Sequence, residues 1–243
     1  MILKSEAIVV KSFDFRETSR IATFFTKDFG KLKGVLKGIR RDPKKFGSSV
    51  DRYTVNDIVY YHSRRTDLHL ISHCDLKQFF FAVREDYKRS VAANYALELI
   101  DSIMPAEQPN IKVYDLLKDF LKSLETVKDI NKLVHIFQIK ILLYSGFKPH
   151  LDSCVRCRRK IKKRARFSHK LGGLLCDLCP SQETDNAMIS QGAVLSILHI
   201  EQSQWAEALK LGLTKSVKEE LKFTLNNFLV YHLEKYIKAS KFL

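Results

Sequence analysis

The first part of the chain alternates between apolar and polar positions at the short spacing of β-strands. Segments rich in Val, Ile, Thr and Phe recur at residues 5–13, 19–28, 31–40, 53–63 and 67–75. In the third segment the spacing sets three apolar residues toward a core and three lysines toward water, namely Leu32, Val35 and Leu36 against Lys31, Lys33 and Lys37. Gly30 predicts a tight turn at 28–31, because glycine adopts a positive φ at little cost. Five short strands predict a barrel or a sandwich, and their number favours an OB-type barrel.

Beyond residue 77 the spacing of apolar residues changes to that of α-helices. Helices are predicted over 78–104, 113–125, 130–147, 190–202 and 215–242. The third is apolar on most sides, which predicts a central helix that Gly146 ends. Ser216 and Glu219 predict a capping box for the last helix. The predicted fold class is therefore α+β, with an OB-type domain at 1–77 and an α-helical domain at 78–243 that contains an inserted module at 150–182.

Four of the five cysteines form two CxxC pairs, made by Cys154, Cys157, Cys176 and Cys179. Eighteen residues separate the pairs, within the gap of about 15–20 residues that is typical of structural zinc sites. Residues 169–173, HKLGG, predict the hairpin turn that brings the second pair to the first. Four thiolates close a tetrahedral shell and leave no position for a reactive water. The pattern thus predicts one structural Zn²⁺ per chain.

Two disulfides, a redox-active CxxC and a chance grouping are the competing interpretations of the four cysteines. Disulfides need an oxidising compartment, which nothing in the sequence indicates. A redox CxxC belongs in a thioredoxin-like βαβ context, which is absent. His169 lies inside the module and is expected at the surface, while the isolated Cys74 is expected to be a small buried hydrophobic residue.

The chain is strongly basic, with 42 Lys and Arg against 27 Asp and Glu and a net charge of +15. Such an excess attracts polyanions, of which nucleic acid is the commonest and an anionic membrane the next candidate. An N-terminal cluster predicts a groove that follows a phosphate backbone through Arg16, Arg20, Lys31, Lys33, Lys37, Arg40, Arg41, Lys44 and Lys45. A second run, in the cysteine module, indicates either a solvated face or another polyanion contact through Arg158, Arg159, Lys162 and Lys163.

Several function classes lack their signatures. The sequence contains no GxxxxGK[ST], GxGxxG, GxSxG or HExxH motif, and its carboxylates form no evident catalytic pair. No apolar run approaches the roughly 20 residues needed to cross a bilayer. Lys4, Glu6 and Lys11 interrupt the apolar N-terminus, which is therefore not a signal peptide. A soluble intracellular protein that is not an enzyme and has no membrane partner is expected.

The order of these parts resembles the bacterial RecO family of DNA repair and recombination mediators. The resemblance rests on EAIVV at 6–10, ETSRI at 17–21, DFGK at 28–31 and KGIRR at 37–41, followed by Phe46 and Gly47. It continues in LLYSGFKPHLDSC at 142–154, where a helix ends just before the first CxxC. The resemblance covers the whole chain in architecture and is most specific at 5–47 and 142–179.

The resemblance implies an OB fold, a helical body, a zinc module and a role without enzymatic turnover. Proteins of this family bind single- and double-stranded DNA and anneal complementary strands. With RecR they help RecA displace the single-stranded-DNA-binding protein, and they dock the acidic, hydrophobic C-terminal tail of that protein. The resemblance also implies a cytoplasmic, nucleoid-associated bacterial protein. On the residues alone, two alternatives stay open: a zinc-stabilised adaptor for acidic proteins, and a nucleic-acid enzyme with an unrecognised site.

Overall fold

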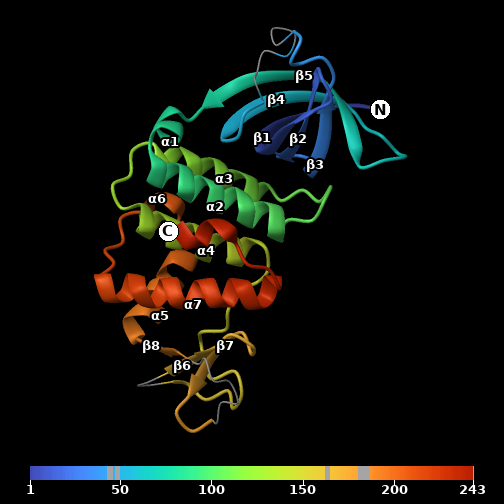
Figure 1. Cartoon of the computed structure of the whole chain (residues 1–243). Helices are drawn as coiled ribbons and strands as arrows, with labels where there is room; N and C mark the ends of the chain where they lie inside the picture. The colour runs from blue at the N-terminus through green and yellow to red at the C-terminus, as the bar shows by residue number, and fades with distance from the viewer. Residues whose placement is uncertain (43–45, 47–49, 162–164, 180–186, 243) are drawn as a thin grey trace. The chain divides into compact units, whose positions relative to one another are not determined.

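The computed structural model describes residues 1–42, 46, 50–161, 165–179 and 187–242 (Figure 1). The chain divides into two compact units, residues 1–127 and residues 128–241. Among the described residues, no helix combines the length and the apolar character that a membrane span requires.

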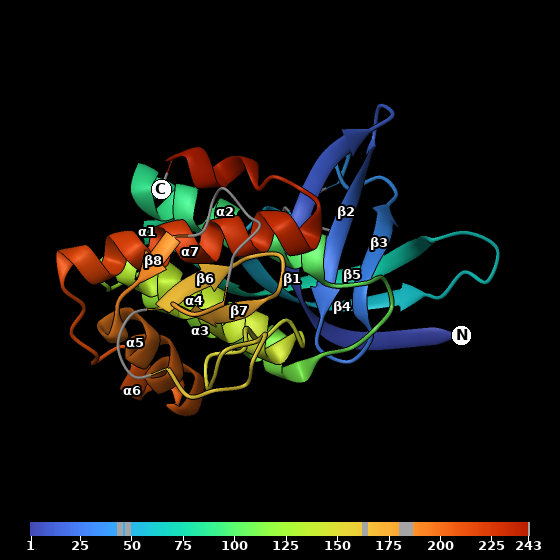
Figure 2. The same ribbon diagram turned by 90° about the horizontal axis from the view of Figure 1, so that it is seen from below.

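The first unit opens with a closed five-stranded barrel (Figures 1 and 2). Its strands are β1 (Ile2–Phe15), β2 (Ser19–Thr26), β3 (Gly30–Leu36), β4 (Thr54–Tyr61) and β5 (Leu68–Phe79). They follow the order β1-β2-β3-β5-β4, in which β3 and β5 run parallel and β4 pairs with β1 to close the barrel. The predicted OB-type barrel is confirmed, and the sandwich alternative is wrong. The barrel core includes Val9, Phe24, Leu36, Ile58 and Ile71, all at most 1% exposed.

The predicted turn between β2 and β3 is confirmed, and Gly30 is required there for two reasons. Its φ of +70° lies in the left-handed region that favours glycine. A Cβ at this position would also lie 2.3 Å from the backbone oxygen of Gln108. The chain around Gln108 is held close by a bridge between Lys31 and Ala106 and by a hydrogen bond of 2.9 Å from the Glu107 N–H to the Lys31 carbonyl.

We expect Gly30→Ala to lower the free energy of unfolding by about 2–5 kcal/mol, the sum of left-handed strain and overpacking. Gly38→Ala is the matched control, because Gly38 has a φ of +81° but no atom within 4 Å of an added Cβ. That variant should lose only the conformational part, about 1–2 kcal/mol. Urea unfolding measures both losses. Equal losses would show that the close approach to Gln108 is not a constraint.

Three helices complete the first unit, namely α1 (Phe81–Glu85), α2 (Tyr87–Ile103) and α3 (Ile111–Leu124). The prediction of one helix over 78–104 was wrong, because β5 continues to Phe79 and the helix breaks at Asp86. Asp86 has an extended backbone, and its carboxylate accepts the Arg89 N–H at 2.9 Å. A short acidic side chain stabilises a new helix N-terminus better than it stabilises a helix interior.

The partly buried carboxylate of Glu6 links β1 to α3 in this unit. Glu6 accepts hydrogen bonds from the Lys118 ammonium at 2.7 Å, the Tyr114 hydroxyl at 3.0 Å and the Lys77 ammonium at 3.2 Å. Burial opposes ionisation of Glu6, but the bonds from Lys118, Lys77 and Tyr114 outweigh it and lower the pKa of the carboxyl. The helices are therefore fixed to the barrel by charge-assisted bonds as well as by apolar packing.

The second unit surrounds one buried helix. Its elements are α4 (Ile130–Tyr144), β6 (Ala165–Ser168), β7 (Gly173–Cys176), β8 (Ala187–Ile189), α5 (Gln191–Gln202), α6 (Trp205–Ala208), α7 (Lys215–Leu233) and a 3-10 turn (Lys238–Phe242). Every residue of α4 from 133 to 142 is buried, which confirms the predicted central helix. The ammonium group of the buried Lys140 donates to the carbonyls of Glu201 and Ser203 and thereby caps the C-terminus of α5. Burial lowers the pKa of Lys140.

The N-terminus of α7 differs from the prediction. Thr214 is the N-cap and accepts the Val217 N–H at 3.3 Å, so the predicted capping box of Ser216 and Glu219 is wrong. The helix begins at Lys215 and already contains Ser216. It also ends earlier than predicted, at Leu233, because Glu234 takes the left-handed conformation at φ +49°.

Candidate zinc centre and nucleic-acid surface

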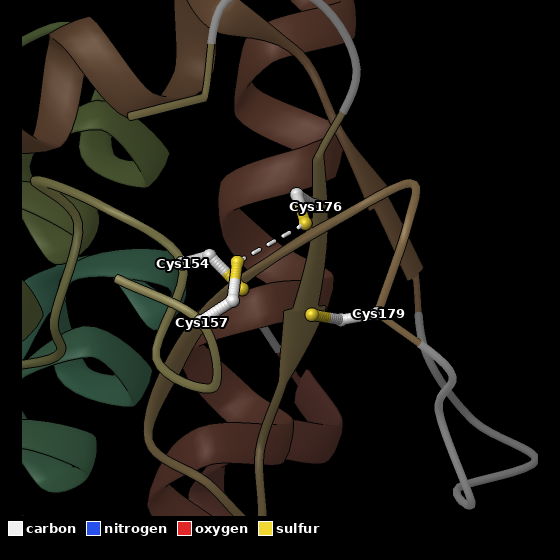
Figure 3. Close-up of side chains that lie close together, drawn as sticks. All are labelled: Cys154, Cys157, Cys176 and Cys179. Carbon is white, nitrogen blue, oxygen red and sulfur yellow. Dashed lines mark hydrogen bonds between the residues drawn. The ribbon is translucent and has the colours of Figure 1, made fainter. Parts of the chain in front are cut away.

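The β6–β7 hairpin brings the two CxxC pairs together (Figure 3). Cys154 and Cys157 lie in the loop before the hairpin, Cys176 ends β7, and Cys179 follows it. The Val155 N–H donates to the Leu174 carbonyl at 2.8 Å and ties the first loop to β7. The predicted turn at 169–173 is confirmed, with Gly172 at φ +70°. All four side chains point toward one another.

The four thiols have the spacing of a tetrahedral metal site. Their Sγ atoms all lie within 4.8 Å of one another, and Cys157 Sγ lies 3.7 Å from Cys176 Sγ. Four sulfurs at about 2.3 Å from one zinc ion are about 3.8 Å apart. None of these cysteines forms a disulfide, whose sulfurs would be about 2 Å apart. The cluster is therefore compatible with one zinc ion in a closed shell.

The pKa values of the clustered thiols explain why this site favours a bound cation. Burial opposes ionisation of Cys154, but backbone N–H groups of residues 157, 176 and 156 outweigh it and lower the pKa of this thiol to about 6. Burial and hydrogen bonds from the other three cysteines raise the pKa of Cys179 to about 12. Thiolates so close repel one another, so all four ionise together only around a positive ion.

His169 does not lie at the surface, contrary to the prediction. It is 6% exposed, and its ring centroid lies 5.3 Å from that of Phe167 and 6.3 Å from that of Phe223 on α7. The hairpin turn packs on an aromatic face of α7, which local sequence does not indicate. His169 is not part of the described metal-ligating clusters.

The basic run of the module is only partly described. Arg158 and Arg159 are exposed directly after the first CxxC, and neither forms an ion pair with any residue that the structure describes. Arg158 adopts φ +62° in the tight turn, where its N–H donates to the Cys154 carbonyl at 2.9 Å. Lys162 and Lys163 lie outside the described residues.

In the first unit, the connections at one end of the barrel bring the predicted basic residues together. The backbone N–H of Arg40, after β3, donates to the Thr18 carbonyl in the β1–β2 turn at 3.0 Å. The Arg40 guanidinium reaches the carbonyls of Arg16 and Glu17 at 3.3 and 3.1 Å. Lys37 and Arg41 flank this contact and are exposed. We call the set Arg16, Lys37, Arg40 and Arg41 the basic end of the barrel.

The predicted cations differ in how far they are available to a ligand. Lys33, Lys37 and Arg41 are exposed and form no ion pair within the described ranges. Arg16 is exposed, with its guanidinium carbon 5.2 Å from the centroid of the Phe15 ring. Lys44 and Lys45 lie outside the described residues.

Three other predicted cations are held by the protein's own acids. Arg20 Nε lies 2.9 Å and Arg40 Nε 3.4 Å from carboxylate oxygens of Asp14. The hydrogen bond from Arg20 lowers the pKa of Asp14, and the charge of Arg40 adds to this effect. Lys31 was expected to face water, but only 16% of its side chain is exposed and its ammonium lies 3.2 Å from Asp101 on α2. The burial of Lys31 depends on Asp101, an acidic residue that lies on α2 and is distant in sequence.

Two arginines near the basic end were missed by sequence reasoning. Arg84 on α1 lies 3.1 Å from Asp51, whose carboxylate is also 3.5 Å from Arg20. Arg52 follows Asp51 and donates to Asn94 on α2 at 2.9 Å. Neither arginine belongs to a dense basic run, so only the packing of α1 and α2 on the barrel could identify them.

A second titratable cluster, His62, His69 and Glu107, does not fit a metal. The Ser63 N–H donates to His69 Nδ1 at 3.1 Å, so Nε2 carries the proton that is shared with Glu107 at 2.9 Å. A metal bound to Nε2 of His69 would use the lone pair of that nitrogen, so the ring proton would have to move to Nδ1. The Nδ1–H would then face the Ser63 N–H, and two donors would point at each other. The cluster is better explained as a hydrogen-bonded support for the α2–α3 connection.

Comparison with known proteins agrees with this architecture. The family model described as Recombination protein O N terminal matches residues 1–80, and Recombination protein O C terminal matches residues 84–241. The DNA repair protein RecO of Caldicellulosiruptor bescii is 33% identical, with 99% of this chain and 97% of that protein covered. DNA repair protein RecO of Alkaliphilus metalliredigens is 30% identical, with 97% and 95% covered. Since the two family models together match nearly the whole chain, the chain belongs to the RecO family of DNA repair proteins.

Proposed function

We propose that this protein binds single- and double-stranded DNA through the basic end of the barrel, without reading base sequence. The observation that carries this is the group of exposed cations, Lys37, Arg41 and the neighbouring Lys33, that have no acidic partner among the described residues. Such side chains neutralise phosphates and release counterions, which favours any strand alike. Acids hold Arg20 and Arg40 in place and so shape this surface.

The zinc module supports a second contact with DNA. Arg158 and Arg159 are exposed on a loop whose conformation depends on the first CxxC. We propose that Cys154, Cys157, Cys176 and Cys179 hold one structural zinc ion, which fixes that loop. Two basic surfaces on one chain lower the electrostatic cost of bringing two strands together, which is the physical basis of annealing.

The cellular role that we propose is that of a recombination mediator without enzymatic turnover. The curated relatives are named DNA repair proteins. The family resemblance adds strand annealing, assistance by RecR, loading of RecA, and docking of the C-terminal tail of the single-stranded-DNA-binding protein.

Annealing tests this function directly. Complementary strands coated with single-stranded-DNA-binding protein should anneal at least about tenfold faster with this protein than without it, because neutralised phosphates repel one another less. Fluorescence energy transfer between labelled strands measures the rate. Bovine albumin at the same concentration is the control for crowding. An unchanged rate, with DNA binding intact, would contradict the mediator role.

A further inference from the structure

The first unit contains a polar cavity of about 300 Å³ beside the basic end of the barrel. Its lining consists of Ser12, Arg20, Asp51, Arg52, Tyr53 and Arg84. Three guanidinium groups against one carboxylate give the lining a net charge of +2, and Asp14 outside the lining, 2.9 Å from Arg20, reduces it to about +1. A cavity with this charge favours an anion, and its volume admits a group much larger than a water molecule.

Asp51 and an aromatic ring orient two of the guanidinium groups. The Asp51 carboxylate lies 3.5 Å from Arg20 and 3.1 Å from Arg84, on opposite oxygens. The Arg84 guanidinium carbon also lies 4.8 Å from the centroid of the Phe79 ring. A guanidinium has five N–H donors in one plane, so an ion pair with Asp51 leaves donors for a ligand. The side chains of Arg20 and Arg84 are each about one third exposed, so the surrounding protein restricts their movement.

Asn94 on α2 holds the other side of the cavity. Its Oδ1 accepts from Arg52 at 2.9 Å and from the Tyr53 hydroxyl at 2.7 Å. Tyr53 adopts φ +63°, a conformation that is uncommon for a residue with a large side chain and that clusters at functional sites. Ser12 also lines the cavity, and its buried hydroxyl has no hydrogen-bond partner within the described parts of the chain.

We propose that this cavity binds one phosphate group of a DNA strand. The proposal rests on the proposed function and adds a discrete anchoring site to it. Planar guanidinium groups match two phosphate oxygens at once, and a hydroxyl donor completes the shell. A bound phosphate would share the positive charge that Asp51 now neutralises only in part. The exposed cations of the basic end would then guide the strand, and the cavity would fix its register.

Inorganic pyrophosphate, titrated into the full chain in a calorimeter at constant ionic strength, tests the site. One saturable site is expected, and Arg52→Gln or Arg84→Gln should weaken it by about tenfold or more, the loss of one charge-assisted hydrogen bond. Arg65→Gln is the control, because Arg65 is exposed in the β4–β5 connection, outside the cavity. Absence of a saturable site, or equal affinity in all four proteins, would overturn the proposal.

The Ser12→Ala variant separates a loss of pyrophosphate binding from a loss of stability. Because the hydroxyl has no partner, its removal should leave the urea midpoint unchanged or raised while the affinity for pyrophosphate falls. A fall in the urea midpoint with unchanged pyrophosphate affinity would count against Ser12 as a ligand contact and overturn its place in the site.

Competition with oligonucleotides identifies the source of the phosphate. Displacement of pyrophosphate by a single strand without a terminal phosphate indicates an internal phosphodiester, and displacement only by the 5′-phosphorylated strand indicates a strand end. DNA that binds without displacing pyrophosphate would overturn the assignment to DNA while leaving the proposed function intact. A chain that binds no DNA at all would instead contradict the proposed function.

Discussion

Reversing two exposed charges, Lys37→Glu with Arg41→Glu, is expected to lower single-strand affinity by about 20-fold or more in 0.1 M salt. Each phosphate contact on a single strand adds about 0.7 to the slope of log affinity against log salt concentration. Loss of two contacts therefore flattens that slope by about 1.4. Fluorescence anisotropy of a labelled oligonucleotide at several salt concentrations measures both quantities.

The matched control reverses two other exposed arginines, Arg64→Glu with Arg65→Glu, and changes the net charge by the same amount. Both lie in the connection that enters β5, whereas Lys37 follows the end of β3. Since β3 and β5 are parallel, these positions are at opposite ends of the barrel. An equal loss in both double variants would indicate attraction by net charge alone. Unchanged affinity after Lys37 and Arg41 are reversed would mean that DNA binds elsewhere on the chain.

Replacing one ligand of the cysteine cluster, Cys157→Ser, is expected to abolish zinc binding and unfold the β6–β7 hairpin. Structural zinc contributes on the order of 10 kcal/mol to the folding of comparably small modules. The hairpin has only short strands of four residues and few residues in its own core. Metal analysis should show one zinc per chain before the change and close to none after it.

Hydrogen exchange locates the damage. The Val155 N–H, which donates to Leu174, and the Leu174 N–H, which donates to His150, should lose protection in the variant or after chelation. Cys74→Ala is the control, since Cys74 is fully buried in the barrel core and belongs to neither described metal-ligating cluster. It should keep the zinc. A metal-free protein with four free thiols and unchanged protection would contradict a structural zinc site.

Local patterns in the chain were sufficient for the existence of the five barrel strands and for the grouping of the four cysteines. Alternation at two-residue spacing marked all five barrel strands, and a doubled CxxC with one hairpin turn marked the four clustered cysteines. Gly30 was predictable because a positive φ limits the choice of residue at that point alone. The strands and the turn depend on neighbours within a few positions, and the two CxxC pairs are only eighteen residues apart, so the sequence itself contains the information.

Contacts between residues far apart in the sequence determined the features that the spacing of apolar and polar residues does not predict. Closure of the barrel depends on pairing between β1 and β4, and the burial of His169 depends on aromatic residues of α7. The fate of each basic residue likewise depends on acids far away in the chain, as Lys31 and Asp101 show. Sequence alone determined that the barrel is rich in positive charge. The tertiary structure decided which charges stay free and which line a cavity, because electrostatic interactions follow distance in space and not position along the chain.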